Sequence, residues 1–238
     1  MNTSWNDSAP GARQSAEFCH PNQCPCHRSG GPSHSRALQL PAAPAVPERA
    51  RRPMALKSTI YKATLQIADM DRSLYADHAL TLARHPSETD ERLMMRLLAF
   101  ALRVPADDRL GLLTSAAGLS DVDEPDLWQK DLTGELRQWV EVGQPDERRL
   151  TKACARAERV GIYAYSSAVP VWWSGMSGKV DRLANLEVWQ VPAEQSQSLA
   201  ELAERSMQLQ VTVQEGLVWF GNGERSVELA PRRLHPAP

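Results

Sequence analysis

The chain has 238 residues, of which 42% are hydrophobic, and its formal net charge is −2 at pH 7. This size and composition indicate a soluble globular protein. No apolar run approaches the roughly 20 residues that a helix needs to span a bilayer, so a membrane protein is excluded.

The composition changes sharply near Met54. Residues 1–53 hold nearly half of the 17 prolines and three of the four cysteines, with many Ser and Gly residues. Such a segment cannot bury enough apolar surface to offset the conformational entropy lost on folding. We therefore predict a disordered extension over 1–53 and a single folded domain over 54–238. Because Met54 opens a stretch that looks like a natural start, a misassigned upstream start codon is the simplest account of the extension.

The cysteines indicate neither disulfides nor zinc. Cys19, Cys24 and Cys26 lie near three histidines, but their spacing differs from the Cys-x2-Cys pairs of zinc sites. Cys154 lies among alanines in a predicted helix, which is typical of a small core residue. The extension also lacks the apolar segment of a secretory signal. We therefore expect a protein of the reducing cytoplasm, without zinc.

The sign of the net charge also changes between residues 53 and 54. The extension carries six Lys or Arg residues and three Asp or Glu residues, which leaves residues 54–238 with 21 and 26 and a net charge of about −5. Domains that bind nucleic acid usually present a basic face, because neutralising phosphates supplies most of the affinity. Any contact with DNA or RNA must therefore be local.

Hydrophobic periodicity, caps and turn residues predict an alternation of strands and helices along the domain. The expected strands cover 56–67, 110–115, 160–165, 186–191, 209–213 and 217–220, and the expected helices cover 69–85, 87–102, 145–157, 169–183 and 192–207. A strand that is followed by a helix and another strand favours parallel pairing. The sequence thus predicts a mixed α/β domain with a central mixed sheet flanked by helices.

The helix over 87–102 has the clearest signals. Ser87, Thr89 and Asp90 suit its N-terminus, and apolar residues recur along one face. Glu91 borders that apolar face. It either complements the helix dipole or serves as an inward-facing carboxylate, and we favour the dipole role.

Residues 124–143 read as a hairpin whose register decides where two acids lie. A two-residue turn at Thr133-Gly134 pairs Leu127 with Val140 and Trp128 with Trp139. The same register puts Asp126 directly across from Glu141, so two carboxylates share one face. It also puts Lys130 opposite Arg137.

A three-residue loop over 132–134, with Gly134 in the left-handed region, is the alternative. It pairs Asp131 with Glu135 and breaks the apolar pairs, which costs a few tenths to about 1 kcal/mol per mismatched pair. We prefer the first register by a narrow margin.

Several segments carry a resemblance to a known family. They are Met54-Ala55-Leu56-Lys57, Leu80 to Thr89, Asp123-Glu124-Pro125, and Gly143 to Cys154 with its Pro145-Asp146-Glu147-Arg148-Arg149 run. Together they resemble the YaeQ family of bacterial proteins. That family is similar in fold to the PD-(D/E)xK nuclease superfamily, which implies a restriction-endonuclease-like core of a helix, a mixed sheet, and a helix that crosses to a further strand.

The resemblance also implies a site. Asp126 would be the acid of the first motif and Glu141 that of the second, and both would bind metal. The superfamily keeps a lysine where this chain has Gly143, a departure that puts catalysis in doubt. Lys152 in the following helix would supply the missing cation, with Lys130 a weaker candidate. Glu91 would match the acid that the first helix often contributes.

Such a constellation suits phosphodiester hydrolysis. Neighbouring carboxylates repel one another unless a cation is present, and Mg²⁺, with Mn²⁺ as a substitute, binds one or two carboxylates while keeping several waters. The metal would lower the pKa of a bound water, and Lys152 would orient the nucleophile. In the simpler interpretation, Asp126 and Glu141 are strand-end acids and Lys152 is a solvated helix residue.

Two functions from different classes therefore remain open. The first is a Mg²⁺-dependent phosphodiesterase or nuclease that acts on DNA or RNA, which the surviving acids favour. The second is a catalytically inactive nuclease-fold protein that binds a protein partner in transcription or repair, which the acidic domain favours. Fold alone does not decide between them. Trp172 and Trp173 suit a partner surface, but paired tryptophans are more often core, and we assign them no function.

Overall fold

The computed structural model describes residues 58–106, 111–115 and 124–236. In these ranges the chain forms four helices and eleven strands, and the strands make two mixed sheets. The mixed α/β class predicted from the sequence is confirmed, with the strands divided between two sheets that helices flank. The extension predicted over 1–53, with its three cysteines, lies outside the described residues.

The first sheet joins strands from both ends of the domain. Its order is β10-β9-β8-β1-β2. The strands are β1 (Thr59–Asp69), β2 (Leu74–Arg84), β8 (Ser206–Gln214), β9 (Leu217–Gly221) and β10 (Ser226–Leu229). β1 pairs antiparallel with β2 and parallel with β8, so its second neighbouring strand comes from the far end of the domain.

The second sheet holds the predicted hairpin, β4–β5. Its order is β11-β7-β6-β5-β4-β3. The strands are β3 (Leu113–Ser115), β4 (Leu127–Lys130), β5 (Leu136–Val142), β6 (Ala157–Ala164), β7 (Leu186–Gln190) and β11 (Arg232–His235). β5 and β6 are parallel and are joined by helix α2 (Glu147–Arg156), which confirms the crossover expected from the sequence.

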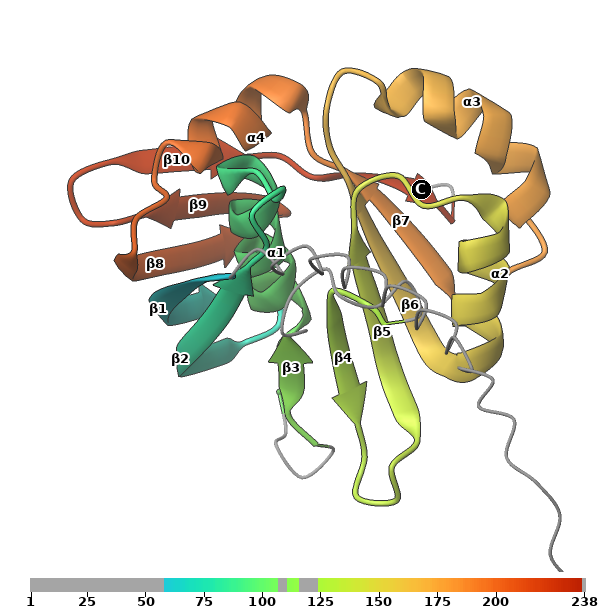
Figure 1. Ribbon diagram of the computed structural model, residues 1–238, viewed down its shortest axis with the longest axis horizontal. Coiled ribbons are helices and arrows are strands. Elements are labelled where there is room, and N and C mark those ends of the chain that lie inside the picture. The colour runs from blue at the N-terminus through green and yellow to red at the C-terminus, as the bar shows by residue number, and fades with distance from the viewer. Residues whose placement is uncertain (1–57, 107–110, 116–123, 237–238) are drawn as a thin grey trace, which may run out of the picture. The chain divides into compact units, whose positions relative to one another are not determined.

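Helix α1 (Asp90–Arg103) lies between the two sheets (Figure 1). The hydroxyl of Thr89 accepts a hydrogen bond from the N–H of Arg92, and this caps the helix as predicted. All nine residues from Leu93 to Ala101 are buried. The eight that are hydrophobic pack with side chains of both sheets in the larger core, so α1 is the layer that holds the sheets together.

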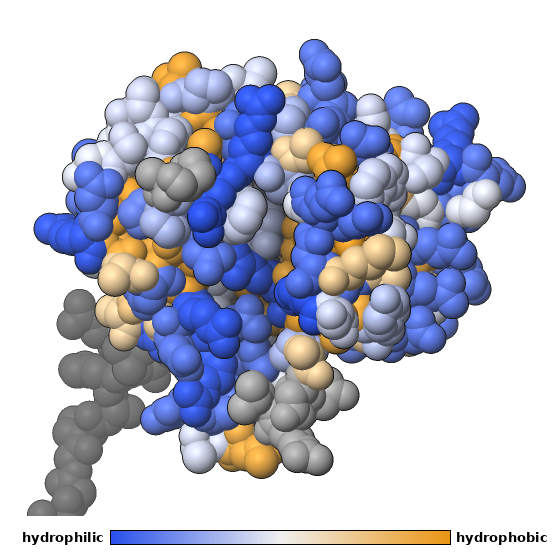
Figure 2. Space-filling model, turned by 180° about the vertical axis from the view of Figure 1, so that it is seen from behind, coloured by the Kyte–Doolittle hydropathy of each residue, from blue (hydrophilic) through white to orange (hydrophobic). Residues whose placement is uncertain are grey.

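The opposite face of the second sheet is covered by α2 and α3 (Val169–Val180) (Figure 1). Trp139, Leu150 and Met176 belong to the separate core formed there. Helix α4 (Ala193–Ala200) packs against α1 and β10. Seen from behind, the surface is mostly hydrophilic, with hydrophobic residues in separate patches (Figure 2). None of the described helices is long and apolar enough to cross a bilayer.

Two predicted helices are corrected. The helix expected over 69–85 is wrong, because residues 74–84 form β2. Leu74 and Leu82 are buried whereas Tyr75 is 71% exposed, so the apolar residues at even positions mark one face of a strand. The helix that begins after Pro192 ends at Ala200 and not at residue 207, and Ser206 already belongs to β8.

Three arginines of α1 reach the second sheet. Arg92 contacts the ends of β4 and β5, Arg96 contacts Ser115 of β3, and Arg103 contacts Tyr163 and Glu187 of β6 and β7. They recur at nearly helical spacing and therefore share one side of the helix. Arg96 is only 1% exposed and pairs with the equally buried Glu88 at 3.1 Å.

The buried Arg96–Glu88 pair yields a stability prediction. Arg96→Ala should lower the free energy of unfolding by about 3–5 kcal/mol, because it leaves the Glu88 carboxylate buried without a counter-charge. Urea unfolding followed by circular dichroism measures this loss. The double variant Glu88→Gln/Arg96→Met should lose less, because it removes both charges. Arg182→Ala, at an exposed arginine, is the control and should change the free energy of unfolding little. A change at Arg96 as small as that of the control would contradict the prediction.

Candidate functional site

The hairpin combines features of both registers weighed from the sequence. Leu127 pairs with Val140 and Trp128 with Trp139, which confirms the preferred register. The turn, however, is the three-residue loop of the alternative, with Gly134 at φ +88°. An irregularity after Gln129 reconciles the two, so that Lys130 pairs with Leu136. The expected pairing of Lys130 with Arg137 is therefore wrong.

Asp131 explains why the loop tolerates like charges at its base. Its carboxylate accepts hydrogen bonds from the Thr133 hydroxyl at 2.6 Å, the Thr133 N–H at 2.8 Å and the Glu135 N–H at 3.0 Å. Arg137 donates to its other oxygen at 3.0 Å. These bonds, that of the Thr133 hydroxyl above all, lower the pKa of Asp131 to about 2. Local hydrogen bonding thus stabilises the charged form of Asp131 at the base of the loop.

The hairpin should consequently weaken in acid. A carboxyl group whose folded pKa is depressed stabilises the fold above its unfolded pKa of 3.8, and this contribution is lost as pH falls towards about 2. Between these pH values, the melting temperature of wild type should fall more steeply than that of Asp131→Asn. Calorimetric scans of both proteins from pH 5 to pH 2 measure the difference, and parallel curves would contradict the prediction.

Asp126 lies immediately before β4, where the register places it level with Glu141. Its side chain is buried, and both carboxylate oxygens accept hydrogen bonds from Arg92 Nη2, at 2.8 and 2.9 Å. The Val142 N–H donates to the same carboxylate at 2.8 Å, and Arg92 Nη1 donates to the Val142 carbonyl. Arg92 therefore ties α1 to the ends of both hairpin strands.

Glu141 is held from the α2 side. Arg149 Nε lies 2.7 and 2.6 Å from its two oxygens, and Trp139 Nε1 donates to it at 2.7 Å. Burial nevertheless raises the pKa of Glu141, and the negative charge of Asp126 adds to the effect. The two predicted ligands are thus close enough to interact electrostatically, but each has its own arginine.

Glu91 and Tyr165 lie beside this pair. Burial raises the pKa of Tyr165, Arg92 lowers it, and Glu91 and Asp126 raise it further. Glu91 also accepts a hydrogen bond from the Ser196 hydroxyl of α4 at 2.6 Å. We call Glu91, Arg92, Asp126, Glu141, Arg149 and Tyr165 the strand-end cluster.

Gly143 occupies the position where the nuclease superfamily keeps its lysine. Its backbone has φ +116°, in the left-handed region that strains other residues. A Cβ atom at this position would lie 3.2 Å from Arg92 Nη1, which is tighter than an ordinary contact. The structure thus gives a physical reason for the departure noted in the sequence.

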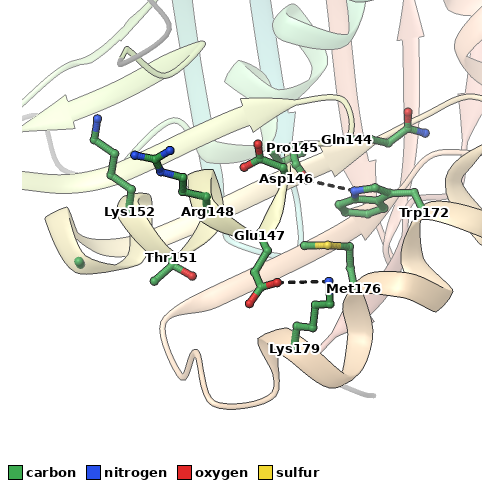
Figure 3. A pocket seen from close by; sticks show the side chains of 11 residues that line it. Gln144, Pro145, Asp146, Glu147, Arg148, Thr151, Lys152, Trp172, Met176 and Lys179 are labelled. Atoms are coloured by element: carbon green, nitrogen blue, oxygen red, sulfur yellow. Dashed lines mark hydrogen bonds and ion pairs between the residues drawn. The ribbon is translucent and has the colours of Figure 1, made fainter.

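Lys152, the expected replacement for that lysine, is exposed on α2. It lines a groove between α2 and α3 of about 910 Å³ (Figure 3). The α2 side chain that contacts Glu141 is Arg149, one turn earlier. The catalytic role expected for Lys152 stays a prediction.

The cluster does not fit a divalent metal as it is arranged. Within the described ranges, no group of three or more His, Cys, Asp or Glu residues is placed to hold a metal ion. A carboxylate offers about four acceptor positions, and a metal held by both acids needs at least one from each. Asp126 uses three of them and Glu141 uses three, with arginine as a donor to both oxygens in each case. About one position on each carboxylate is left, so Mg²⁺ or Mn²⁺ would compete for it with a guanidinium group that is already in place.

Comparison with known proteins identifies the family. A model of the family described as "YaeQ protein" matches residues 54–231. The chain belongs to the YaeQ family. The uncharacterized YaeQ proteins of Salmonella typhi and Escherichia coli K12 are 46% and 44% identical to it over 177 residues. These matches cover 74% of the chain and 95% of each relative.

Solved structures carry the same family name. The crystal structure of YaeQ from Xanthomonas axonopodis pv. citri is similar to this chain with a TM-score of 0.70 and 46% identity, over 76% of the chain and 99% of its own. YaeQ from Pseudomonas syringae is similar with a TM-score of 0.69 and 38% identity, over 74% of this chain and 96% of its own. Both likenesses support the fold described above.

Sequence reasoning missed Arg92 and Arg149, although both lie beside residues that it considered. Arg92 follows Glu91, and its spacing to Arg96 and Arg103 marks one side of α1. Arg149 lies one residue from the groove-lining Arg148. Cys154, interpreted as a core residue, is half-buried, and burial raises the pKa of its thiol to about 11.

Proposed function

We propose that this chain is an interaction or regulatory protein built on a nuclease-like core, and not a metal-dependent phosphodiesterase. The observation that carries the proposal is the pairing of Asp126 with Arg92 and of Glu141 with Arg149. The core itself is consistent with the family resemblance. It runs from α1 through the antiparallel β3–β4–β5 and across α2 to the parallel β6.

The energetic reason is competition for the carboxylates. Mg²⁺ gives up its waters reluctantly and demands nearly octahedral oxygen ligands. Each guanidinium is tethered beside its carboxylate and already donates charge-assisted hydrogen bonds. Displacing it would leave a partly buried cation without its counter-ion, which is costly.

A second candidate is the Mg²⁺- or Mn²⁺-dependent phosphodiesterase acting on DNA or RNA. It is favoured by the grouping of three acids, because Asp126 interacts electrostatically with Glu141, and Glu91 and Asp126 both act on Tyr165. When bound, such a metal would supply a water of lowered pKa and stabilise charge on the phosphate. In this candidate Asp126 and Glu141 hold the metal, Glu91 is an accessory acid, and Lys152 orients the nucleophile.

Metal titration separates the two candidates. Calorimetry should show no saturable binding of Mg²⁺ or Mn²⁺ to wild type, and neither supercoiled plasmid nor RNA should be cleaved. Asp126→Asn and Glu141→Gln are the matched controls. Metal binding that these variants abolish, together with cleavage by wild type, would overturn the proposal in favour of the second candidate. Cleavage unchanged in Lys152→Ala would then remove Lys152 from the mechanism.

The groove between α2 and α3 is the surface that we assign to the partner. Arg148 and Lys152 extend side by side from α2, with Trp172, Met176 and Lys179 on the α3 side (Figure 3). The indole of Trp172 is fixed because its Nε1 donates to the Pro145 carbonyl at 3.0 Å.

The charges of this groove favour an anionic partner. It is lined by three cations and two acids; of these, Glu147 pairs with Lys179 at 3.2 Å and Asp146 caps α2, so Arg148 and Lys152 give the groove its positive charge. Cations that follow phosphates beside an aromatic ring suit single-stranded nucleic acid, since bases of any sequence stack on such a ring. We therefore assign single-stranded DNA or RNA to the groove, with an acidic protein segment as the competing occupant.

A labelled oligonucleotide tests the assignment. A fluorescein-labelled thymidine oligomer should bind wild type at low salt, and the charge reversal Arg148→Glu/Lys152→Glu should weaken binding about tenfold or more. Arg182→Glu, an exposed reversal outside the groove, is the control and should leave affinity nearly unchanged. Fluorescence anisotropy measures both. No binding by wild type, or equal loss in the control, would rule out nucleic acid as the occupant of this groove.

A further inference from the structure

We propose that Arg92 is a built-in counter-ion that occupies the cation position of the strand-end cluster and so keeps divalent metal out. The inference rests on the proposed function and deepens it, because it names the device that closes the site.

The first observation is the set of atoms that converge on one guanidinium. Nη2 donates hydrogen bonds to both oxygens of Asp126, and Nη1 donates one to the main-chain carbonyl of Val142. A carboxylate together with a backbone carbonyl is the kind of hard oxygen set that also binds Mg²⁺, Mn²⁺ or Ca²⁺. Arg92 therefore lies where these oxygens would direct a metal ion.

The second observation is the fit between Arg92 and Gly143. A Cβ atom at Gly143 would lie 3.2 Å from Arg92 Nη1, so a side chain there would push the guanidinium out of its present position by a few tenths of an ångström. The positive φ of Gly143 independently disfavours one. Gly143 and Arg92 are thus complementary. Arg92 of α1 supplies the positive charge that the nuclease superfamily would place on a lysine at position 143.

The third observation is that the position of Arg92 leaves one of its nitrogens buried without a hydrogen bond. Its Nε is buried and has no hydrogen-bond partner among the described residues. An unsatisfied buried donor lowers stability, so the hydrogen bonds made by Nη1 and Nη2 must offset that loss. Burial lowers the pKa of Arg92, yet the nearby negative charge, led by Asp126, raises it overall. The group is permanently charged, as an internal counter-ion must be.

Removal of Arg92 should create a need for another cation. Asp126 would then remain buried beside Glu141, whose pKa is already raised by burial and by the Asp126 charge. Two neighbouring carboxylates without the Arg92 charge would repel one another, and an added divalent ion would relieve the repulsion. The Arg92 side chain is 23% exposed, so an ion can reach the position from solvent once the guanidinium is gone.

The test compares four proteins in one titration. Wild type, Arg92→Ala, Arg92→Lys and Arg92→Ala/Asp126→Asn are titrated with MnCl₂ by calorimetry, and their melting temperatures are measured with and without it. Arg92→Ala should bind one Mn²⁺ about tenfold or more tightly than wild type and should melt at a higher temperature when Mn²⁺ is present. The double variant should lose that binding. Arg92→Lys, which keeps the charge, should resemble wild type.

Each outcome decides something. A folded Arg92→Ala that binds Mn²⁺ no better than wild type overturns the inference and leaves the proposed function standing. Equal Mn²⁺ binding by the double variant places the ion elsewhere and also overturns the inference. Tight Mn²⁺ binding by wild type overturns the proposed function itself. If Arg92→Ala does not fold alone, Mn²⁺-dependent recovery of its circular dichroism supports the inference, and no recovery overturns it.

Discussion

The structure depends on the burial of one helix that carries charge into the core. Helix α1 lies between two sheets, so the side that faces the second sheet is largely shielded from solvent. Arg92, Arg96 and Arg103 nevertheless lie on that side, and each is paired with a carboxylate. Removing water from an ion is costly unless the geometry of the pair is good. The position of α1 is therefore specified by where its charges find partners as well as by apolar packing.

That requirement also shapes the strand-end cluster. A carboxylate at the end of a strand can be neutralised by metal, by solvent or by a fixed cation, and this chain supplies arginine to Asp126 and to Glu141. Arginine does not lose its proton at any physiological pH, and its planar fork matches a carboxylate. In the proposed function, a cluster closed in this way does not bind metal. Arg92 would then have two roles, because it ties α1 to the second sheet and also occupies the carboxylate of Asp126.

Local patterns were sufficient for much of this architecture. The cap at Thr89, the register that pairs Trp128 with Trp139, and the parallel crossover through α2 all followed from residues close in sequence. β2 was mistaken for a helix because its apolar residues also fit a helical pattern over a short window. The partners of the arginines could not be foreseen in this way. Arg92 and Asp126 are 34 residues apart, and only the folded sheets bring them together.

The parallel pairing of β1 with β8 has a consequence for how the chain is made. Lys62 lies beside Ser206, which is synthesised 144 residues later. β1 therefore cannot pair with β8 until most of the domain has been made. Contacts between such distant segments form slowly, because the loop must close before they contribute. Until then one edge of β1 and one side of α1 lack their native cover. A nascent chain that stalls before residue 206 would expose a strand edge capable of pairing with another chain.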